Sequence, residues 1–133
     1  HQARFAADPR LPADLTLRAI LRLDLQDASG RNAPVVDLVA AARAALDQAW
    51  LLMLRAARLQ DTGVAIRGEA SMAKLVASET CGKIVDAMLQ LHGGNGYSQD
   101  YESERLYRDA RVMRIFEGTS EIQREVIARD VFG

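Results

Sequence analysis

Residues 35–91 contain two long runs of small and apolar side chains spaced three or four residues apart, with one short break between them. This spacing places the side chains on one face of an α-helix and predicts helices over residues 35–60 and 68–91. The intervening segment DTGVAIRG, residues 61–68, ends the first helix and turns the chain. Two long helices joined by so short a turn are expected to lie side by side and antiparallel.

Two shorter helices are predicted after this helical hairpin. The segment HGGNGYSQD, residues 92–100, stops the second helix, with Gly93 or Gly94 as its left-handed cap. A third helix follows over residues 102–111 and a fourth over residues 120–131. Ser120 and Gln123 have the spacing of a capping box. The apolar side chains expected to face inward are Leu106, Tyr107, Ile122, Val126 and Ile127.

The predicted fold class is all-α, an antiparallel helical bundle. No convincing strand pattern follows residue 34, and alanine, leucine and arginine dominate a chain with only 3 prolines. A length of 133 residues favours one domain, which we place at residues 34–133. Residues 1–33 match the bundle poorly: a loop precedes DLTLRAILRLDLQD, whose leucines combine partial alternation with the length of a helix.

Charge and cysteine content exclude several classes of function. The formal net charge of −1 gives no basic excess for nucleic acid or an anionic membrane surface. The run AWLLMLRAARL is too short, and too interrupted by arginine, to span a bilayer. Cys81 is the single cysteine, so no internal disulfide forms, and it is expected to be a small buried residue. Two histidines and one cysteine, widely spaced, do not make a metal site.

The first motif with a chemical use is QLHGGNGY, residues 90–97. Its three glycines let a ligand approach the backbone closely and leave N–H groups free to face an anion. It is not a P-loop, because no Lys-Ser/Thr follows. It is not the dinucleotide-binding fingerprint either, because it ends a helix instead of joining a strand to a helix. A helix cap and turn is the simpler interpretation of this motif alone. His92 is either a ligand contact or a packing side chain.

The second motif is FEGTSEIQ, residues 116–123, in which Glu117 follows two bulky apolar residues. A carboxylate set in an apolar wall is poorly solvated and therefore a stronger base. The nearby helix N-terminus opposes this effect, since its dipole favours the anion. Gly118 leaves access for a ligand, and the hydroxyls and amides that follow offer contacts to a polar group. From residue chemistry alone, a surface acid before a capped helix is the simpler interpretation.

In this order and at this spacing, the two motifs together resemble the C-terminal helical domain of the acyl-CoA dehydrogenases. QLHGGNGY, followed by RLYRDARVMRIFEGTSEIQREVIAR, is close to the family pattern over residues 90–129, and the two preceding helices also fit. The pair is far more specific than either motif alone. A complete family member also has an N-terminal helical domain and a middle β domain. The resemblance therefore implies a fragment or truncated member, inactive when isolated.

The resemblance implies FAD-dependent dehydrogenation across the Cα–Cβ bond of an acyl-CoA thioester. The position that matches the family's base is Glu117, which would take the α-proton while the β-hydrogen leaves as hydride to the flavin. The backbone N–H of Glu117 would help to polarise the thioester carbonyl. Phe116 and Gly118 flank the base and are expected to contact the substrate.

The resemblance also implies cofactor contacts. Thr119 and Glu121 lie where the family touches the ribose and adenine side of FAD, although many members have glutamine in place of Glu121. Contacts to the FAD of a neighbouring subunit are expected from Gln90, Leu91, His92, Gly93 and Gly94. Binding across a subunit boundary implies a homo-oligomer, a dimer or tetramer. The expected electron acceptor is an electron-transferring flavoprotein, and the expected location is the bacterial cytoplasm or the mitochondrial matrix.

A second class of function stays open from the sequence. The chain would then be a non-catalytic helical module for assembly or regulation, derived from the same domain. The intact glutamate and glycine loop favour the enzyme, because such a module has no physical reason to keep a buried acid. The presence or absence of bound flavin would distinguish these two classes of function.

Overall fold

The computed structural model describes residues 33–133, and the predictions for residues 1–32 lie outside that part of the chain. By its packing the chain divides into two units, His1–Val39 and Ala40–Gly133. The described part of the first unit is the beginning of one helix. The second unit contains the motifs identified above and is the subject of the following description.

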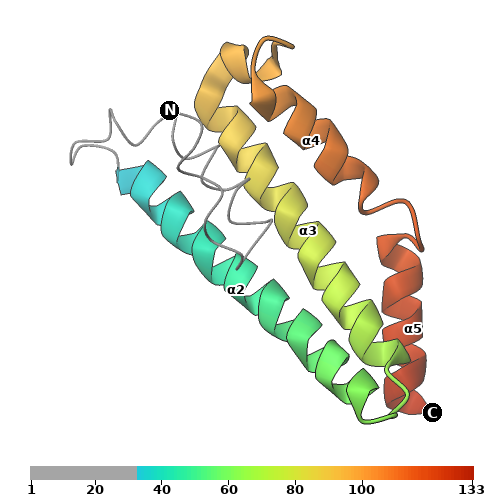
Figure 1. Ribbon diagram of the computed structural model, residues 1–133. Helices are drawn as coiled ribbons and strands as arrows, with labels where there is room; N and C mark the ends of the chain where they lie inside the picture. Colours follow the sequence, from blue (N-terminus) through green and yellow to red (C-terminus); the bar gives the residue numbers. More distant parts are fainter. Residues whose placement is uncertain (1–32) are drawn as a thin grey trace. The chain divides into compact units, whose positions relative to one another are not determined.

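Four α-helices and one short 3-10 helix account for most of the described residues (Figure 1). They are α2 (Ala33–Asp61), α3 (Arg67–His92), η2 (Gly93–Tyr97), α4 (Glu102–Val112) and α5 (Ser120–Phe132). No strand occurs between residues 33 and 133. The predicted all-α class and each of the four predicted helices are confirmed.

The helices α2 and α3 are antiparallel and are joined by a short turn (Figure 1). Near this turn the guanidinium of Arg55 on α2 lies 3.6 Å from the carboxylate of Glu69 on α3. The buried face of α2 consists of small residues seven positions apart. This spacing keeps them in line along the helix. These residues are Ala42, Ala49 and Ala56. Met53, four residues after Ala49, is exposed.

Both later helices pack on α3. α4 runs back along the C-terminal half of α3, and α5 continues in the same direction along its N-terminal half (Figure 1). Gly82 in the middle of α3 faces the side chain of Arg114, which follows α4, and Gly68 at the start of α3 faces Asp130 near the end of α5. The connection from α4 to α5 therefore passes over the middle of α3.

The first turn of α5 places polar side chains against the bundle. Ser120 and Gln123 are buried there, whereas Ile122 is 48% exposed, so the prediction that Ile122 faces inward is wrong. The physical reason is hydrogen bonding, because both buried side chains find polar partners next to α3. Val126 and Ile127, one turn later, are half-buried, as are Leu106 and Tyr107 on α4.

Gly93 ends α3, as the sequence allowed. Its φ of 59° and ψ of −143° lie in a region open almost only to glycine, and its N–H donates to the carbonyl of Gln90. Gly94, the alternative cap, has no positive φ. Two residues further on, Gly96 is buried in η2, and its carbonyl accepts a hydrogen bond from the hydroxyl of Ser103 at 3.2 Å.

We expect Gly93→Ala to lower the free energy of unfolding by about 1–3 kcal/mol, because an L-residue is strained at this backbone conformation. Gly94→Ala is the matched control, since no atom lies within 4 Å of the position of its added Cβ. Urea denaturation of both variants measures the difference. Equal losses at the two positions would contradict the assignment of Gly93 as the cap.

Candidate functional site

A closed loop connects α4 to α5 and carries Glu117. We define the Glu117 loop as residues 114–120. The N–H of Ser120 donates to the carbonyl of Arg114 at 3.1 Å and closes the base of the loop. Near its tip Glu117 has a φ of 53°, the one positive φ of a non-glycine residue between residues 33 and 133, and Gly118 follows with a φ of 88°. A left-handed glutamate is strained, and such strain is typical of functional positions.

The side chain of Gln123 on α5 holds the tip of the loop by its backbone. Its Nε2 donates to the carbonyls of Glu117 and Gly118, each at 3.2 Å. An added Cβ on Gly118 would lie 2.6 Å from the same Nε2, so a side chain there would displace this amide. Gly118 is therefore needed both for its positive φ and for the close approach of Gln123.

The N-cap of α5 is Thr119, one residue before the predicted position. Its hydroxyl accepts a hydrogen bond from the N–H of Ile122 at 3.4 Å. The capping box predicted at Ser120 and Gln123 is wrong, because those two side chains bind α3 and the loop instead. At the same helix end, the backbone N–H of Glu121 and the Thr119 hydroxyl hold the pKa of the Glu121 carboxyl below its ordinary value.

The carboxylate of Glu79 on α3 meets both ends of the Glu117 loop. Its Oε1 accepts a hydrogen bond from the hydroxyl of Ser120 at 2.7 Å and lies 3.4 Å from Nε of Arg114. Arg124 on α5 adds a third contact at 3.7 Å. The Ser120 hydrogen bond is the largest effect and lowers the pKa of Glu79. Burial opposes it as the next-largest effect, and the nearby Arg114, Arg124 and Lys83 cations add smaller contributions that lower the pKa.

Because the pKa of Glu79 is depressed in the folded chain, its contribution to stability is present above its ordinary value of 4.5 and is lost as the pH falls through the folded value. We expect the thermal midpoint of the wild-type chain to fall more steeply below about pH 5 than that of Glu79→Gln. Calorimetry across this pH range measures the two slopes. Parallel slopes would show that Glu79 titrates alike in the folded and unfolded chain.

A second α3 side chain reaches the tip of the loop. Nζ of Lys74 donates to the carbonyl of Gly118 at 2.6 Å. Neither Lys74 nor Glu79 was predicted from the sequence to belong to a site. The available signal was weak: Glu79 is a charged residue within the mostly apolar stripe of its helix. Such a residue near a buried face needs a partner, but the sequence does not say which one.

Glu117 itself is exposed, together with the apolar residues before it. Ile115 is 51% exposed and Phe116 is 44% exposed. The expected apolar wall around the carboxylate is therefore not formed by residues 33–133, and that expectation is corrected. The loop fixes the backbone of Glu117 and presents its side chain outward.

The other predicted site residues gather at the C-terminal end of α3. Gln90, Leu91, Gly93 and Gly94 are exposed, and His92 is half-buried. Nδ1 of His92 lies 2.7 Å from the carbonyl of Met88 and must donate to it, because a carbonyl only accepts. Nε2 is buried and has no hydrogen-bond partner among the described residues.

The two groups of predicted residues lie at different places along α3. The Glu117 loop contacts Lys74 and Glu79, whereas the glycine motif begins at Gln90. The helical segment from Glu79 to Gln90 is about 16 Å long at 1.5 Å per residue. The structure therefore does not bring the two groups together.

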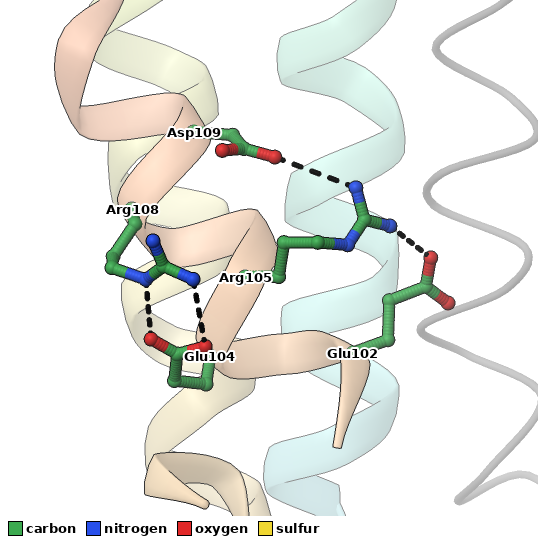
Figure 2. A network of polar contacts seen from close by, with 5 residues as sticks. All are labelled: Glu102, Glu104, Arg105, Arg108 and Asp109. Carbon is green, nitrogen blue, oxygen red and sulfur yellow. Dashed lines mark hydrogen bonds and ion pairs between the residues drawn. The ribbon is translucent and has the colours of Figure 1, made fainter. Parts of the chain in front are cut away.

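The charged side chains of α4 form ion pairs along the helix (Figure 2). The guanidinium of Arg105 lies 2.7 Å from Glu102 and 3.4 Å from Asp109, and Arg108 pairs with Glu104 one turn earlier. Pairs at this spacing on an exposed helix contribute only about 0.2–0.5 kcal/mol each. This segment is therefore a solvated face held by intrahelical ion pairs.

A cavity of about 160 Å³ lies between α3 and α4 and contains none of the predicted site residues. Its lining consists of Gly82, Lys83, Val85, Asp86, Tyr107, Arg111 and Arg114. Within residues 33–133, no helix is long and apolar enough to cross a membrane, and no cluster of side chains is suited to a metal ion.

Cys81 is half-buried on α3 instead of fully buried. Burial still raises the pKa of its thiol, so little thiolate is present at neutral pH. A packing role explains this residue without any reactive chemistry.

Comparison with known proteins decides what this helical arrangement is. A family model described as "Acyl-CoA dehydrogenase, C-terminal domain" matches residues 18–132. The chain belongs to this family. The match begins upstream of the boundary at residue 34 that the sequence suggested and includes both the glycine motif and the Glu117 loop.

Individual acyl-CoA dehydrogenase relatives agree with this assignment. The chain is 49% identical over 83 residues to the Caffeyl-CoA reductase-Etf complex subunit CarC of Acetobacterium woodii, and this match covers 62% of this chain and 22% of that protein. It is 51% identical over 84 residues to the mitochondrial short-chain specific acyl-CoA dehydrogenase of Bos taurus, 63% of this chain and 20% of that protein.

The solved structures agree as well. The chain superimposes on butyryl-CoA dehydrogenase from Megasphaera elsdenii with a TM-score of 0.82 and 26% sequence identity, covering 91% of this chain and 33% of that one. The chain thus spans between a fifth and a third of the length of the acyl-CoA dehydrogenase relatives it matches. The remaining parts of those proteins lie outside the match.

Proposed function

We propose that the chain serves as the C-terminal domain of an FAD-dependent acyl-CoA dehydrogenase, in which Glu117 removes the α-proton of an acyl-CoA thioester. The observation that carries this proposal is the Glu117 loop. A carboxylate stands exposed on a strained backbone that is held by hydrogen bonds from two helices. A base must be fixed in position yet free to reach a proton, and this arrangement meets both requirements.

The surroundings of Glu117 support the same role. Large apolar side chains are exposed on both sides of the carboxylate, which is unusual for a surface without a partner. They are Val112, Met113, Ile115, Phe116 and Ile122. In the complete enzyme the other domains would cover this surface and exclude water from the carboxylate. Loss of water strengthens a carboxylate as a base.

The residues proposed to hold FAD fit such a group. At the start of α5 the hydroxyl of Thr119 and the anionic carboxylate of Glu121 can bind sugar hydroxyls. At the end of α3, no atom lies within 4 Å of a Cβ added to Gly93 or Gly94, so a ligand can approach that backbone closely. When bound, FAD would supply the acceptor for the hydride from the β-carbon.

The direct test uses the full-length enzyme that carries this domain. We expect the purified enzyme to be yellow and its flavin absorbance to bleach when an acyl-CoA thioester is added without oxygen. The assay should also be run in reverse, with reduced flavin and an enoyl-CoA thioester, because one relative is named a reductase. An enzyme with bound flavin that reacts in neither direction would contradict the proposal.

The 133-residue chain by itself is expected to self-associate and to bind FAD poorly. Leu51 and Met53 on α2 are exposed in addition to the apolar residues around the loop, and burial of apolar area yields about 25 cal/mol per Å². FAD would lose the contacts of the other domains, and the remaining ones are individually weak. Light scattering on the size-exclusion peak, with and without FAD, measures both properties. A monomer, or stoichiometric FAD, would contradict the expectation.

In the complete enzyme we propose a homo-oligomer that passes electrons to an electron-transferring flavoprotein. The homo-oligomer is supported by the two separate groups of predicted cofactor contacts, because one chain would then touch FAD in its own subunit and in a neighbour. The name of the Acetobacterium woodii relative, a subunit of a reductase–Etf complex, supports the electron acceptor.

A further inference from the structure

We propose that Glu79 is a positioning residue for Glu117, which holds the Glu117 loop closed and thereby fixes the proposed base. This inference rests on the proposed function for its consequence in catalysis. Its structural part, that Glu79 keeps the loop closed, stands on the contacts within the chain and is tested separately.

The geometry places a single carboxylate oxygen at the base of the loop. Oε1 of Glu79 accepts from the hydroxyl of Ser120 at 2.7 Å and lies 3.4 Å from Nε of Arg114. Ser120 and Arg114 are the two ends of the loop, and their backbones are joined by the 3.1 Å hydrogen bond that closes it. Glu79 thus ties together the same two residues that the backbone hydrogen bond joins.

Removing the carboxylate would leave its partners without compensation. Nε of Arg114 is buried and makes no hydrogen bond, so its contact with Glu79 is an electrostatic one. The hydroxyl of Ser120 lies in a buried residue and donates to Glu79 alone among the contacts described. A buried polar group without its partner is unfavourable, and opening the loop to water is the simplest relief.

The strained tip makes the loop dependent on these contacts. Glu117 has a φ of 53°, which an L-residue leaves when nothing holds it. Lys74 and Gln123 fix the tip through the carbonyl of Gly118, at 2.6 Å and 3.2 Å. They act at the tip, whereas Glu79 acts at the base. Loss of Glu79 would therefore free the loop at its ends while the tip contacts remain.

The structural part is tested in the 133-residue chain by the exchange of the Ser120 amide hydrogen, followed by NMR. This amide closes the loop, so its protection reports the closed state. We expect Glu79→Ala to accelerate its exchange about tenfold or more relative to the amides of the α3 interior. Glu79→Gln keeps an oxygen for the Ser120 hydroxyl but loses the charge, and it should fall between wild type and Glu79→Ala.

The matched control is Glu104→Ala. Glu104 is also a helical glutamate paired with an arginine, and its side chain is 16% exposed compared with 22% for Glu79. It lies on α4 and makes no described contact with the Glu117 loop. Exchange at Ser120 should be unchanged in this variant. Equal acceleration in Glu79→Ala and Glu104→Ala would overturn the inference.

The catalytic part is tested in the full-length enzyme. We expect Glu79→Ala to lower kcat by about ten- to a hundredfold, as for a displaced catalytic group, with FAD content and KM close to wild type. Glu79→Gln should restore part of kcat. A loss of FAD or a rise in KM with unchanged kcat would overturn the positioning role, because these changes would indicate damage to binding.

Two further measurements keep the outcomes distinct. If Glu79→Ala does not fold, Ser120→Ala removes the same hydrogen bond while the pairing of Glu79 with Arg114 remains, and the same changes in exchange and kcat are expected. If Glu117→Gln leaves the reaction intact, the proposed base is wrong, and the Ser120 exchange still decides whether Glu79 closes the loop. Unchanged exchange in both Glu79→Ala and Ser120→Ala would overturn the inference.

Discussion

Glu117→Gln is expected to abolish acyl-CoA dehydrogenation in the full-length enzyme while FAD stays bound. An amide cannot accept the α-proton, yet it has nearly the shape of the carboxylate. The backbone at this position should also be kept, because glutamine bears the same strain as glutamate at a φ of 53°. Loss of general-base catalysis lowers rates by about 10²- to 10⁴-fold. Anaerobic flavin bleaching by an acyl-CoA thioester measures the rate.

The control for this variant is Glu125→Gln, which changes another exposed glutamate that pairs with Arg129 on α5. Its bleaching rate should equal that of the wild type. Wild-type bleaching in Glu117→Gln, with normal flavin content, would remove Glu117 from the mechanism. Loss of flavin from Glu117→Gln would instead assign the residue to binding.

Gly96→Ala should destabilise the chain by about 3 kcal/mol, near the upper end for overpacking of a buried site. The added Cβ would lie 2.6 Å from the carbonyl oxygen of Leu89 and 2.7 Å from Cβ of His92. The first contact is with helix backbone, which cannot rotate away. The hydrogen bond from Ser103 to the Gly96 carbonyl opposes a shift of the glycine itself. The end of α3 must therefore distort.

Urea denaturation of the 133-residue chain measures this loss, and flavin content of the full-length enzyme measures its functional effect. The distorted end of α3 carries Gln90 and leads directly into Gly93, two of the proposed FAD contacts, so flavin retention should fall as well. Gly94→Ala lies in the same 3-10 helix but in open space, and it should leave the stability of the chain unchanged. Normal stability of Gly96→Ala would mean that η2 adjusts without cost.

The helices could be predicted from the sequence because their signals are local. The repeat of small and apolar residues defined α2 and α3, and the glycines after Leu91 marked where α3 ends. Helical periodicity and caps depend on residues a few positions apart, which a single sequence displays directly. The acyl-CoA dehydrogenase resemblance rested on motifs of the same local kind.

The contacts that hold the Glu117 loop could not be predicted in this way. Ser120 and Glu79 are 41 positions apart, and Lys74 and Gly118 are 44 apart. Their meeting depends on how α5 packs on α3, and no local pattern encodes that. The same packing explains the error at Ile122, whose apolar side chain fitted the helical repeat although polar residues took the inward positions.

The left-handed backbone of Glu117 restricts how this position can change during evolution. A replacement must tolerate a positive φ before its chemistry matters. Glycine, asparagine and aspartate accept this conformation most readily, whereas valine, isoleucine and threonine are strongly disfavoured. A related protein that does without this carboxylate can therefore replace Glu117 by one of a small set of residues without unfolding the loop. Substitutions outside that set would first require the connection between α4 and α5 to be rebuilt.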